Sequence, residues 1–179
     1  REWVALSGQK AFTVIIALIM IYGTVTPMLG QLSLVDISSA LGRDETLTGR
    51  ATVWERVVPL AMERPMLGYG FGSFWSTMSR KEFDISDAHN GYLDIILSIG
   101  FIGLLLYALF LLSSVRTAQD VMRADYDWGA LWICYILVGV LINITESSFV
   151  SFTSKLMATV LIMTVTSSVI PSCVLKKCN

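Results

Sequence analysis

Residues 87–106 read DAHNGYLDIILSIGFIGLLL, and the junction within this stretch decides the fold. A polar segment that contains the only histidine of the chain runs directly into an apolar segment that continues to Leu112. The apolar part is long enough to cross a membrane, so His89 lies at the mouth of a predicted span. An imidazole at that position indicates chemistry, because its charge changes near neutral pH. The alternative is a helix cap among the lipid headgroups.

Five residues of this stretch follow the spacing of one helix face. They are separated by 4, 3, 4 and 3 positions, and they are His89, Leu93, Ile96, Gly100 and Gly103. On a continuous helix Gly100 would lie about 16 Å below His89, half-way through the hydrocarbon layer. We expect the two glycines to let a neighbouring helix approach closely beneath the imidazole, although small residues also serve ordinary helix packing.

Composition assigns the chain to the membrane proteins. Hydrophobic residues make up 54% of it and charged residues only 15%, whereas soluble domains carry about 25% charged residues. Its mean hydropathy is +0.65. Four segments are apolar enough to span a bilayer, and they are approximately Ala11–Leu29, Tyr92–Leu112, Trp128–Ile144 and Leu156–Ile170. The sequence therefore predicts an all-α, polytopic membrane protein in which residues 1–179 form one membrane domain.

The distribution of Lys and Arg predicts the orientation. Basic residues outside the long loop lie before the first span, between the second and third spans, and after the fourth, so these three places belong on the cytoplasmic side. Residues 31–90 then form one large, helical, extracytoplasmic loop. Because the chain starts at Arg1 without a Met, we expect it to be the C-terminal part of a longer protein.

The loop itself shows helix and turn signals. A helix is predicted from about Thr48, with one side formed by Arg50, Trp54, Val57 and Ala61. Pro59 should kink or split this helix, since proline removes a backbone hydrogen bond. Pro65 and the glycine-rich run that follows should end it in a tight turn. Two shorter helices are predicted at residues 34–41 and 73–80.

Several features of the loop and the following span occur together. They are Thr48-Gly49-Arg50, Trp54, Pro65, Gly68, Gly70, Gly72, Phe74, Ala88-His89-Asn90, Gly100 and Gly103. In this combination and topology they resemble the signature of the O-antigen ligase family, which includes Wzy-like polymerases and exopolysaccharide polymerases. The resemblance covers about Gly42 to Leu106. The local sequence around Arg50 and Asn90 is closer to the exopolysaccharide polymerase branch.

The resemblance implies a membrane glycosyltransferase of the bacterial inner membrane with its active face in the periplasm. Such an enzyme inverts the anomeric centre without a metal or another cofactor. The implied donor is a glycan on undecaprenyl pyrophosphate, and the implied acceptor is a sugar hydroxyl of another glycan, with no nucleic-acid partner. His89 would correspond to the general base, and Arg50 to a cation on the donor pyrophosphate.

Further candidate residues come with structural alternatives. Arg43 is a second phosphate contact or the partner of a neighbouring carboxylate. Asn90 is expected to contact substrate. Asp94 contacts substrate or orients the site, and it could equally pair with another span. Glu146 faces the same cavity or is simply a wet interfacial carboxylate. Arg50 itself could stack on Trp54 one turn away.

Functions from other classes are weaker. Gly68-Tyr69-Gly70 is similar to part of a potassium-channel filter, but the preceding Met66-Leu67 and the length of the loop do not fit one. A cytoplasmic nucleotide-sugar transferase would need Asp125 and Asp127 as a metal pair, whereas Asp127 more simply caps the next helix. A scaffold or lipid-flipping role remains as a third possibility. The cysteines match no metal-site spacing.

Overall fold

The computed structural model describes residues 2–29, 45–75, 87–146 and 160–162. Every regular element within these ranges is helical. The helices are α1 (Glu2–Met28), α3 (Glu45–Glu63), α5 (Gly91–Ala124) and α6 (Tyr126–Ile142). The predicted all-α class is therefore confirmed.

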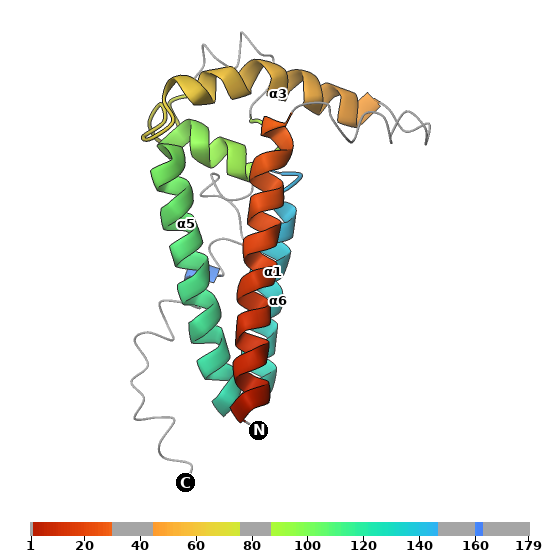
Figure 1. Cartoon of the computed structure of the whole chain (residues 1–179), viewed down its shortest axis with the longest axis vertical. Coiled ribbons are helices and arrows are strands. Elements are labelled where there is room, and N and C mark those ends of the chain that lie inside the picture. Colours follow the sequence, from red (N-terminus) through yellow and green to blue (C-terminus); the bar gives the residue numbers. More distant parts are fainter. Residues whose placement is uncertain (1, 30–44, 76–86, 147–159, 163–179) are drawn as a thin grey trace.

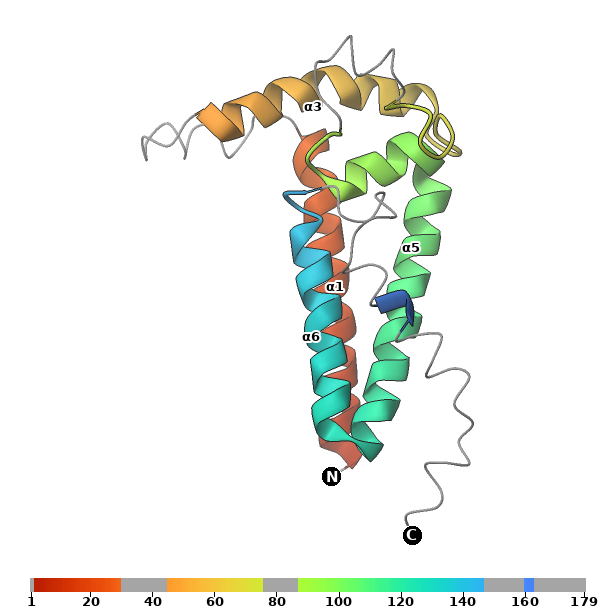
Figure 2. The same ribbon diagram turned by 180° about the vertical axis from the view of Figure 1, so that it is seen from behind.

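Three of the helices form an elongated bundle, and the fourth crosses one end of it (Figures 1 and 2). Helices α1 and α6 and the longer part of α5 run side by side, while α3 lies across the end where α1 finishes and α5 begins. Buried side chains fill the bundle, among them Ile16, Tyr107, Leu111, Val115, Trp132 and Ile136. A second buried cluster lies between α3 and the start of α5. It includes Val57 and Ala61 of α3 together with Phe74, Leu93, Ile96 and Leu97.

Two of the described helices are long and apolar enough to cross a membrane, namely α1 through Ala11–Met28 and α5. Helix α6 is apolar but has 17 residues, about 26 Å at 1.5 Å per residue and so near the lower limit for a span. Large apolar side chains such as Leu18 and Leu105, each 60% exposed, face outward from the bundle. Such surfaces suit contact with lipid or with further apolar helices. The structure is thus that of a helical membrane protein.

Helix α5 is broken at Gly100, which has φ 73° and ψ −167°. Residues 91–99 lie across the end of the bundle beneath α3, and the chain then turns to run along α1 and α6 (Figures 1 and 2). The predicted continuous helix face from His89 to Gly103 is therefore wrong. The expectation that one unbroken helix leads from His89 down to Gly100 is wrong as well. The part that runs along the bundle, Phe101 to Ala124, has a length of about 36 Å and is sufficient to span.

A loop after α3 holds this break by four backbone hydrogen bonds. The amides of Tyr69 and Gly70 donate to the carbonyls of Leu97 and Ser98 at 2.8 and 2.9 Å. In return, two amides beyond the break donate to carbonyls before Gly68: Phe101 N to Pro65 O at 2.7 Å and Ile102 N to Met66 O at 3.3 Å. We call this pairing of residues 65–70 with residues 97–102 the glycine clasp. It satisfies backbone groups that the broken helix leaves open.

The two glycines of the clasp are needed for close backbone contact. A Cβ on Gly68 would lie 2.6 Å from the carbonyl oxygen of Leu97, and one on Gly100 would collide with the carbonyl of Met66. Both have positive φ, at 64° and 73°. The close neighbour of Gly100 is thus a loop, while the nearest atoms to Gly103 belong to Ile95 and Ile99, in the part of α5 before the break. The expectation that Gly100 admits a neighbouring helix is wrong.

Helix α3 agrees with the predicted face and differs at its proline. Val57 and Ala61 are buried at 0% and 1% exposure, and Trp54 and Arg50 are half-buried on the same side. Pro59, which is exposed, does not split the helix, which continues to Glu63. The predicted tight turn follows, with positive φ at Gly68, Gly70 and Gly72.

The connection between α5 and α6 is shorter than predicted. Helix α5 continues through Arg116 to Ala124, and α6 starts at Tyr126. The residue that caps α6 is Asp125, whose side chain accepts a hydrogen bond from Trp128 N, and the predicted cap at Asp127 is wrong.

Some predictions fall outside the described residues. They concern Arg43, Cys173, Cys178, the helix at 34–41, all but the first residues of the helix at 73–80, and all but three residues of the span at 156–170.

Candidate functional site

Four residues that precede α5, Asp87 to Asn90, form the His89 loop, and hydrogen bonds fix each of them. The Nε1 of Trp54 on α3 donates to the carbonyl of Ala88 at 2.9 Å. The amide of Ala88 contacts both carboxylate oxygens of Asp94 at 3.3 and 3.2 Å. The amide of His89 donates to Oδ1 of Asp87 at 2.9 Å. The backbone that carries the imidazole is consequently held in place.

Asn90 ties the loop to two other helices. Its Oδ1 accepts a hydrogen bond from Leu93 N at 2.9 Å, which caps α5. Its Nδ2 donates to the carbonyl of Gly23 on α1 at 3.0 Å and contacts the carbonyl of Ile144 after α6 at 3.3 Å. The side chain is fully buried. Both of its polar atoms are thus used within the protein, which favours a positioning role over the substrate contact that we expected.

Asp94 is a buried carboxylate, 1% exposed, one turn into α5. Besides the Ala88 amide it accepts a hydrogen bond from Trp75 Nε1 at 2.6 Å. Donors at this distance stabilise a carboxylate that would otherwise be costly to bury. Asp94 is therefore bonded to the His89 loop, an arrangement that supports the orienting role, one of the three predicted for it.

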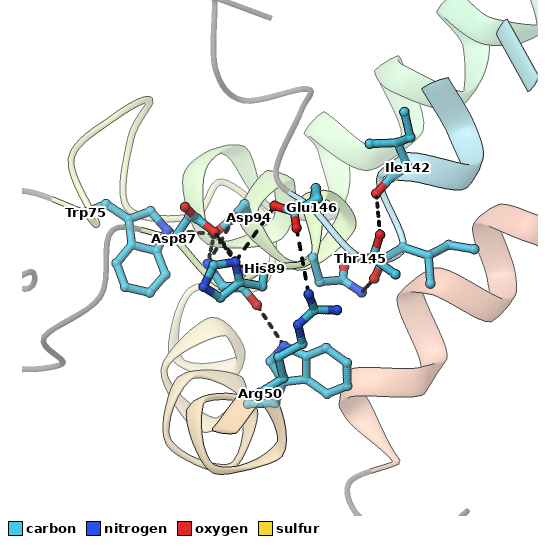
Figure 3. A network of polar contacts seen from close by, with 12 residues as sticks. Arg50, Trp75, Asp87, His89, Asp94, Ile142, Thr145 and Glu146 are labelled. Carbon is cyan, nitrogen blue, oxygen red and sulfur yellow. Dashed lines mark hydrogen bonds and ion pairs between the residues drawn. The ribbon is translucent and has the colours of Figure 1, made fainter. Parts of the chain in front are cut away.

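Four charged or titratable side chains meet beside this loop (Figure 3). A guanidinium nitrogen of Arg50 lies 3.7 Å from Oε1 of Glu146, and Nδ1 of His89 lies 3.9 Å from Oε2 of the same carboxylate. Oδ1 of Asp87 lies 3.3 Å from Nδ1 of His89. Side chains from α3, the His89 loop and the segment after α6 therefore converge on one place at the end of the bundle.

The cluster is open to solvent on one side. The exposed fractions of the side chains are 24% for Arg50, 40% for His89 and 56% for Glu146. Nδ1 of His89 is nevertheless shielded from solvent and has no partner with hydrogen-bond geometry among the described residues. The exposed surface of the imidazole therefore belongs to its other atoms. A base and a fixed cation within reach of one anion suit a reaction in which a proton and a negatively charged group both move.

Comparison with known proteins decides the family. Residues 2–108, more than half of the chain, match the family model described as O-antigen ligase. The chain belongs to the O-antigen ligase family. The family match contains α1, α3, the His89 loop and the glycine clasp, whereas Glu146 lies beyond it.

One curated relative of the chain is the exopolysaccharide production protein ExoQ of Rhizobium meliloti (strain 1021). The two are 32% identical over 89 residues, which is 44% of this chain and 20% of the relative. The chain thus spans about a fifth of that relative's length. No solved structure matches the chain. The resemblance to the family predicted from Arg50, His89 and the glycines is confirmed, and the relative agrees with the exopolysaccharide branch.

The structure brings together most of the site residues predicted for an O-antigen ligase family member. His89, Arg50 and Glu146 meet directly, and Asn90 and Asp94 lie beneath them. Gly49 and Trp54 belong to α3, where Trp54 bonds the loop rather than stacking on Arg50. Gly68, Gly70 and Gly100 lie in the clasp, and Gly103 lies just beyond it. Arg43 is outside the described residues.

Two residues near the site were missing from the predicted set. Asp87 contacts both the backbone and the ring of His89, and Trp75 bonds Asp94. The spacing of Asp87, two residues before His89, is that of an aspartate whose side chain accepts the backbone N–H two positions later. That pattern was readable in the sequence. The Trp75 contact is not local and had no sequence signal.

Proposed function

We propose that this protein contributes to a membrane glycosyltransferase that assembles bacterial surface polysaccharide. The enzyme transfers a glycan from undecaprenyl pyrophosphate to a sugar hydroxyl, with inversion at the anomeric carbon. The observation that carries the proposal is the convergence of Arg50 and His89 on one carboxylate, 3.7 and 3.9 Å away. Membership of the O-antigen ligase family supports the substrate class.

In the proposed reaction His89 removes the proton from the acceptor hydroxyl. The acceptor oxygen then forms a bond to the anomeric carbon, and the bond from that carbon to the pyrophosphate oxygen breaks with its electron pair. The leaving group is undecaprenyl pyrophosphate, so its negative charge grows as the bond breaks. Arg50 holds the donor pyrophosphate before and during this step, because a guanidinium matches phosphate oxygens in a bidentate manner.

Glu146 lies between the two groups. Its carboxylate presents two oxygens to a cation, as a phosphate group also can. The donor phosphate would take over the contact with Arg50, and no metal or other cofactor enters the proposed reaction. The bilayer supplies the setting in which the lipid tail of the donor lies.

Polymerisation of an exopolysaccharide or O-antigen is the reaction we favour, with ligation to lipid A core as the alternative. The named function of the relative, exopolysaccharide production, supports the first. A potassium channel is disfavoured, because the amides of Tyr69 and Gly70 bond the break in α5 and the glycine run therefore serves the clasp. A non-catalytic membrane role would require that loss of His89 leaves transfer unchanged.

We place the protein in the bacterial inner membrane, with α3 and the His89 loop on the periplasmic side. The distribution of Lys and Arg supports this orientation. In agreement, the described site residues lie at one end of the bundle, and Arg116 and Arg123 lie toward the other.

The test is transfer by the purified complete protein with a lipid-linked donor, in the presence and absence of EDTA. We expect undecaprenyl pyrophosphate to be released and the glycan product to have the anomeric configuration opposite to that of the donor. The rate should be the same with and without EDTA. Loss of activity that magnesium or manganese restores would contradict the mechanism. In a host without the gene, accumulation of single repeats indicates a polymerase, and intact but unattached polymer indicates a ligase.

A further inference from the structure

Two carboxylates face the same imidazole nitrogen, and they differ in how firmly they are held. We propose that Asp87 is a positioning residue for His89, holding Nδ1 so that Nε2 is the atom that receives the acceptor proton. The proposal deepens the proposed function and rests on His89 acting there as the base.

A single oxygen of Asp87 contacts two parts of His89. Oδ1 accepts the backbone N–H of His89 at 2.9 Å and lies 3.3 Å from its Nδ1. The first contact closes a short turn that holds the backbone of His89 at φ 50°, a conformation uncommon outside glycine. The second limits rotation of the ring. Both the position and the direction of the imidazole therefore depend on this carboxylate.

The exposure of the ring shows that Nδ1 is not the nitrogen that meets a substrate. Nδ1 is shielded from solvent, although 40% of the side chain is exposed. A neutral imidazole carries one N–H, and a carboxylate beside Nδ1 favours the proton on that nitrogen. Nε2 then keeps its lone pair for the acceptor proton. When His89 becomes an imidazolium, the charge of Asp87 stabilises it.

Glu146 is less suited to this role. Its Oε2 lies 3.9 Å from Nδ1, against 3.3 Å for Asp87, and its side chain is 56% exposed against 30%. It also lies 3.7 Å from Arg50, so it is shared between two cations when His89 is protonated. The contact between Asp87 and Nδ1 lacks hydrogen-bond geometry here, but such contacts commonly shorten once substrate is bound.

The decisive variant is Asp87→Asn in the complete protein. An asparagine oxygen can still accept the N–H of His89 and so preserves the turn, but the negative charge is removed. We expect kcat to fall by roughly 10- to 100-fold with the donor KM unchanged. This is smaller than the roughly 10⁴-fold loss for the buried aspartate of a serine-protease triad, because Asp87 is 30% exposed. Asp120→Asn, at an exposed ion pair on α5, is the matched control and should leave both constants unchanged.

A double-mutant cycle tests whether Asp87 acts through His89. In a His89→Ala background, Asp87→Asn should cause no further loss of kcat. Asp87→Glu, which keeps the charge on a longer side chain, should retain more kcat than Asp87→Asn. Wild-type kcat in Asp87→Asn, an equal loss in both backgrounds, a rise in donor KM alone, or equal rates for Asp87→Glu and Asp87→Asn would each overturn the proposal.

Failure of this proposal is distinguishable from failure of the proposed function. If His89→Ala transfers sugar at the wild-type rate, the base itself is wrong. If His89→Ala is inactive and Asp87→Asn is fully active, only the positioning role is wrong.

Discussion

The two ends of the helical bundle are built in different ways. At the turn between α5 and α6, hydrogen bonds and ion pairs join residues three or four positions apart. Asp125 N donates to Val121 O at 2.8 Å, Trp128 N donates to Asp125 Oδ1 at 3.1 Å, and Arg123 lies 3.3 Å from Asp120. Each of these contacts can form in an isolated helical hairpin.

At the site end the contacts join residues far apart in the chain. Separations of 67, 34 and 19 positions occur in the hydrogen bonds of Asn90 with Gly23, Trp54 with Ala88, and Trp75 with Asp94. Contacts of this kind fix a loop that local bonds would leave free to move. The local bonds at the first end shape the turn, whereas the distant bonds at the site end hold a charged cluster in register.

The largest expected difference between the ends is their accessibility. In a background with the three native cysteines replaced by serine, cysteine at Thr52 should react with a membrane-impermeant thiol reagent in intact spheroplasts, and cysteine at Asp127 should not. Both residues are exposed in the structure, so burial does not explain a difference. The reverse labelling pattern would contradict the proposed orientation.

Removal of the imidazole should have the largest effect on catalysis. His89→Ala is expected to lower the rate of glycan transfer by about 10²- to 10⁴-fold, the usual contribution of a general base. Expression and donor affinity should stay near wild type, because His89 is 40% exposed and contributes little packing. Turnover and donor binding are measured separately, and an unchanged turnover would return His89 to a structural role.

The glycine clasp should be sensitive to a single methyl group. Gly100→Ala puts a Cβ into the carbonyl of Met66 at a residue whose backbone conformation, φ 73° and ψ −167°, suits only glycine. We expect a loss of stability of about 2–5 kcal/mol. Gly72→Ala is the control, since Gly72 also has positive φ but no atom lies within 4 Å of an added Cβ. It should cost about 1–2 kcal/mol, and equal falls in the thermal unfolding midpoint would argue against the clasp.

The charge of Arg50 should affect donor affinity more than turnover. Arg50→Ala is expected to raise the donor KM by about tenfold to a hundredfold, the size of one or two charge-assisted hydrogen bonds. Arg50→Lys should recover only part of this loss, because an ammonium cannot bind two oxygens in the same plane. A full recovery by lysine, measured by titration with lipid-linked donor, would show that only charge is needed.

The smallest effect is expected at the far end. Asp125→Ala removes the cap of α6 and should lower stability by about 1 kcal/mol. Transfer kinetics at permissive temperature should not change, since the turn between α5 and α6 that contains Asp125 lies at the opposite end of the bundle from the start of α5 (Figure 1). A fall in kcat without a fall in the unfolding midpoint would show that the two ends are coupled.

The features predictable from sequence are those with a local cause. The buried side of α3 followed from the spacing of Trp54, Val57 and Ala61, and the turn after it followed from Pro65 and the glycines. The convergence of Arg50 with His89 was indicated by the family resemblance and not by spacing, because the two residues are separated by 39 positions.

The break in α5 was not predictable from residues 87–106 alone. Gly100 fits the periodicity of an unbroken helix equally well, and its partners, the carbonyls and amides of residues 65–70, lie about thirty positions earlier. The structural role of Asn90 was not predicted either. Its type suggested substrate contact, but its acceptors on α1 and after α6 are visible only in three dimensions.

The bonds of Asn90 also set an order of events during biosynthesis. Gly23 leaves the ribosome long before Asn90, and residues 65–70 of the glycine clasp have likewise been made by the time Gly100 emerges. The carbonyl of Ile144 is made later, together with the carboxylate of Glu146 that meets Arg50 and His89. The nascent chain therefore cannot complete the candidate site until it has been synthesised past α6, so a chain that ends before α6 has an unfinished site.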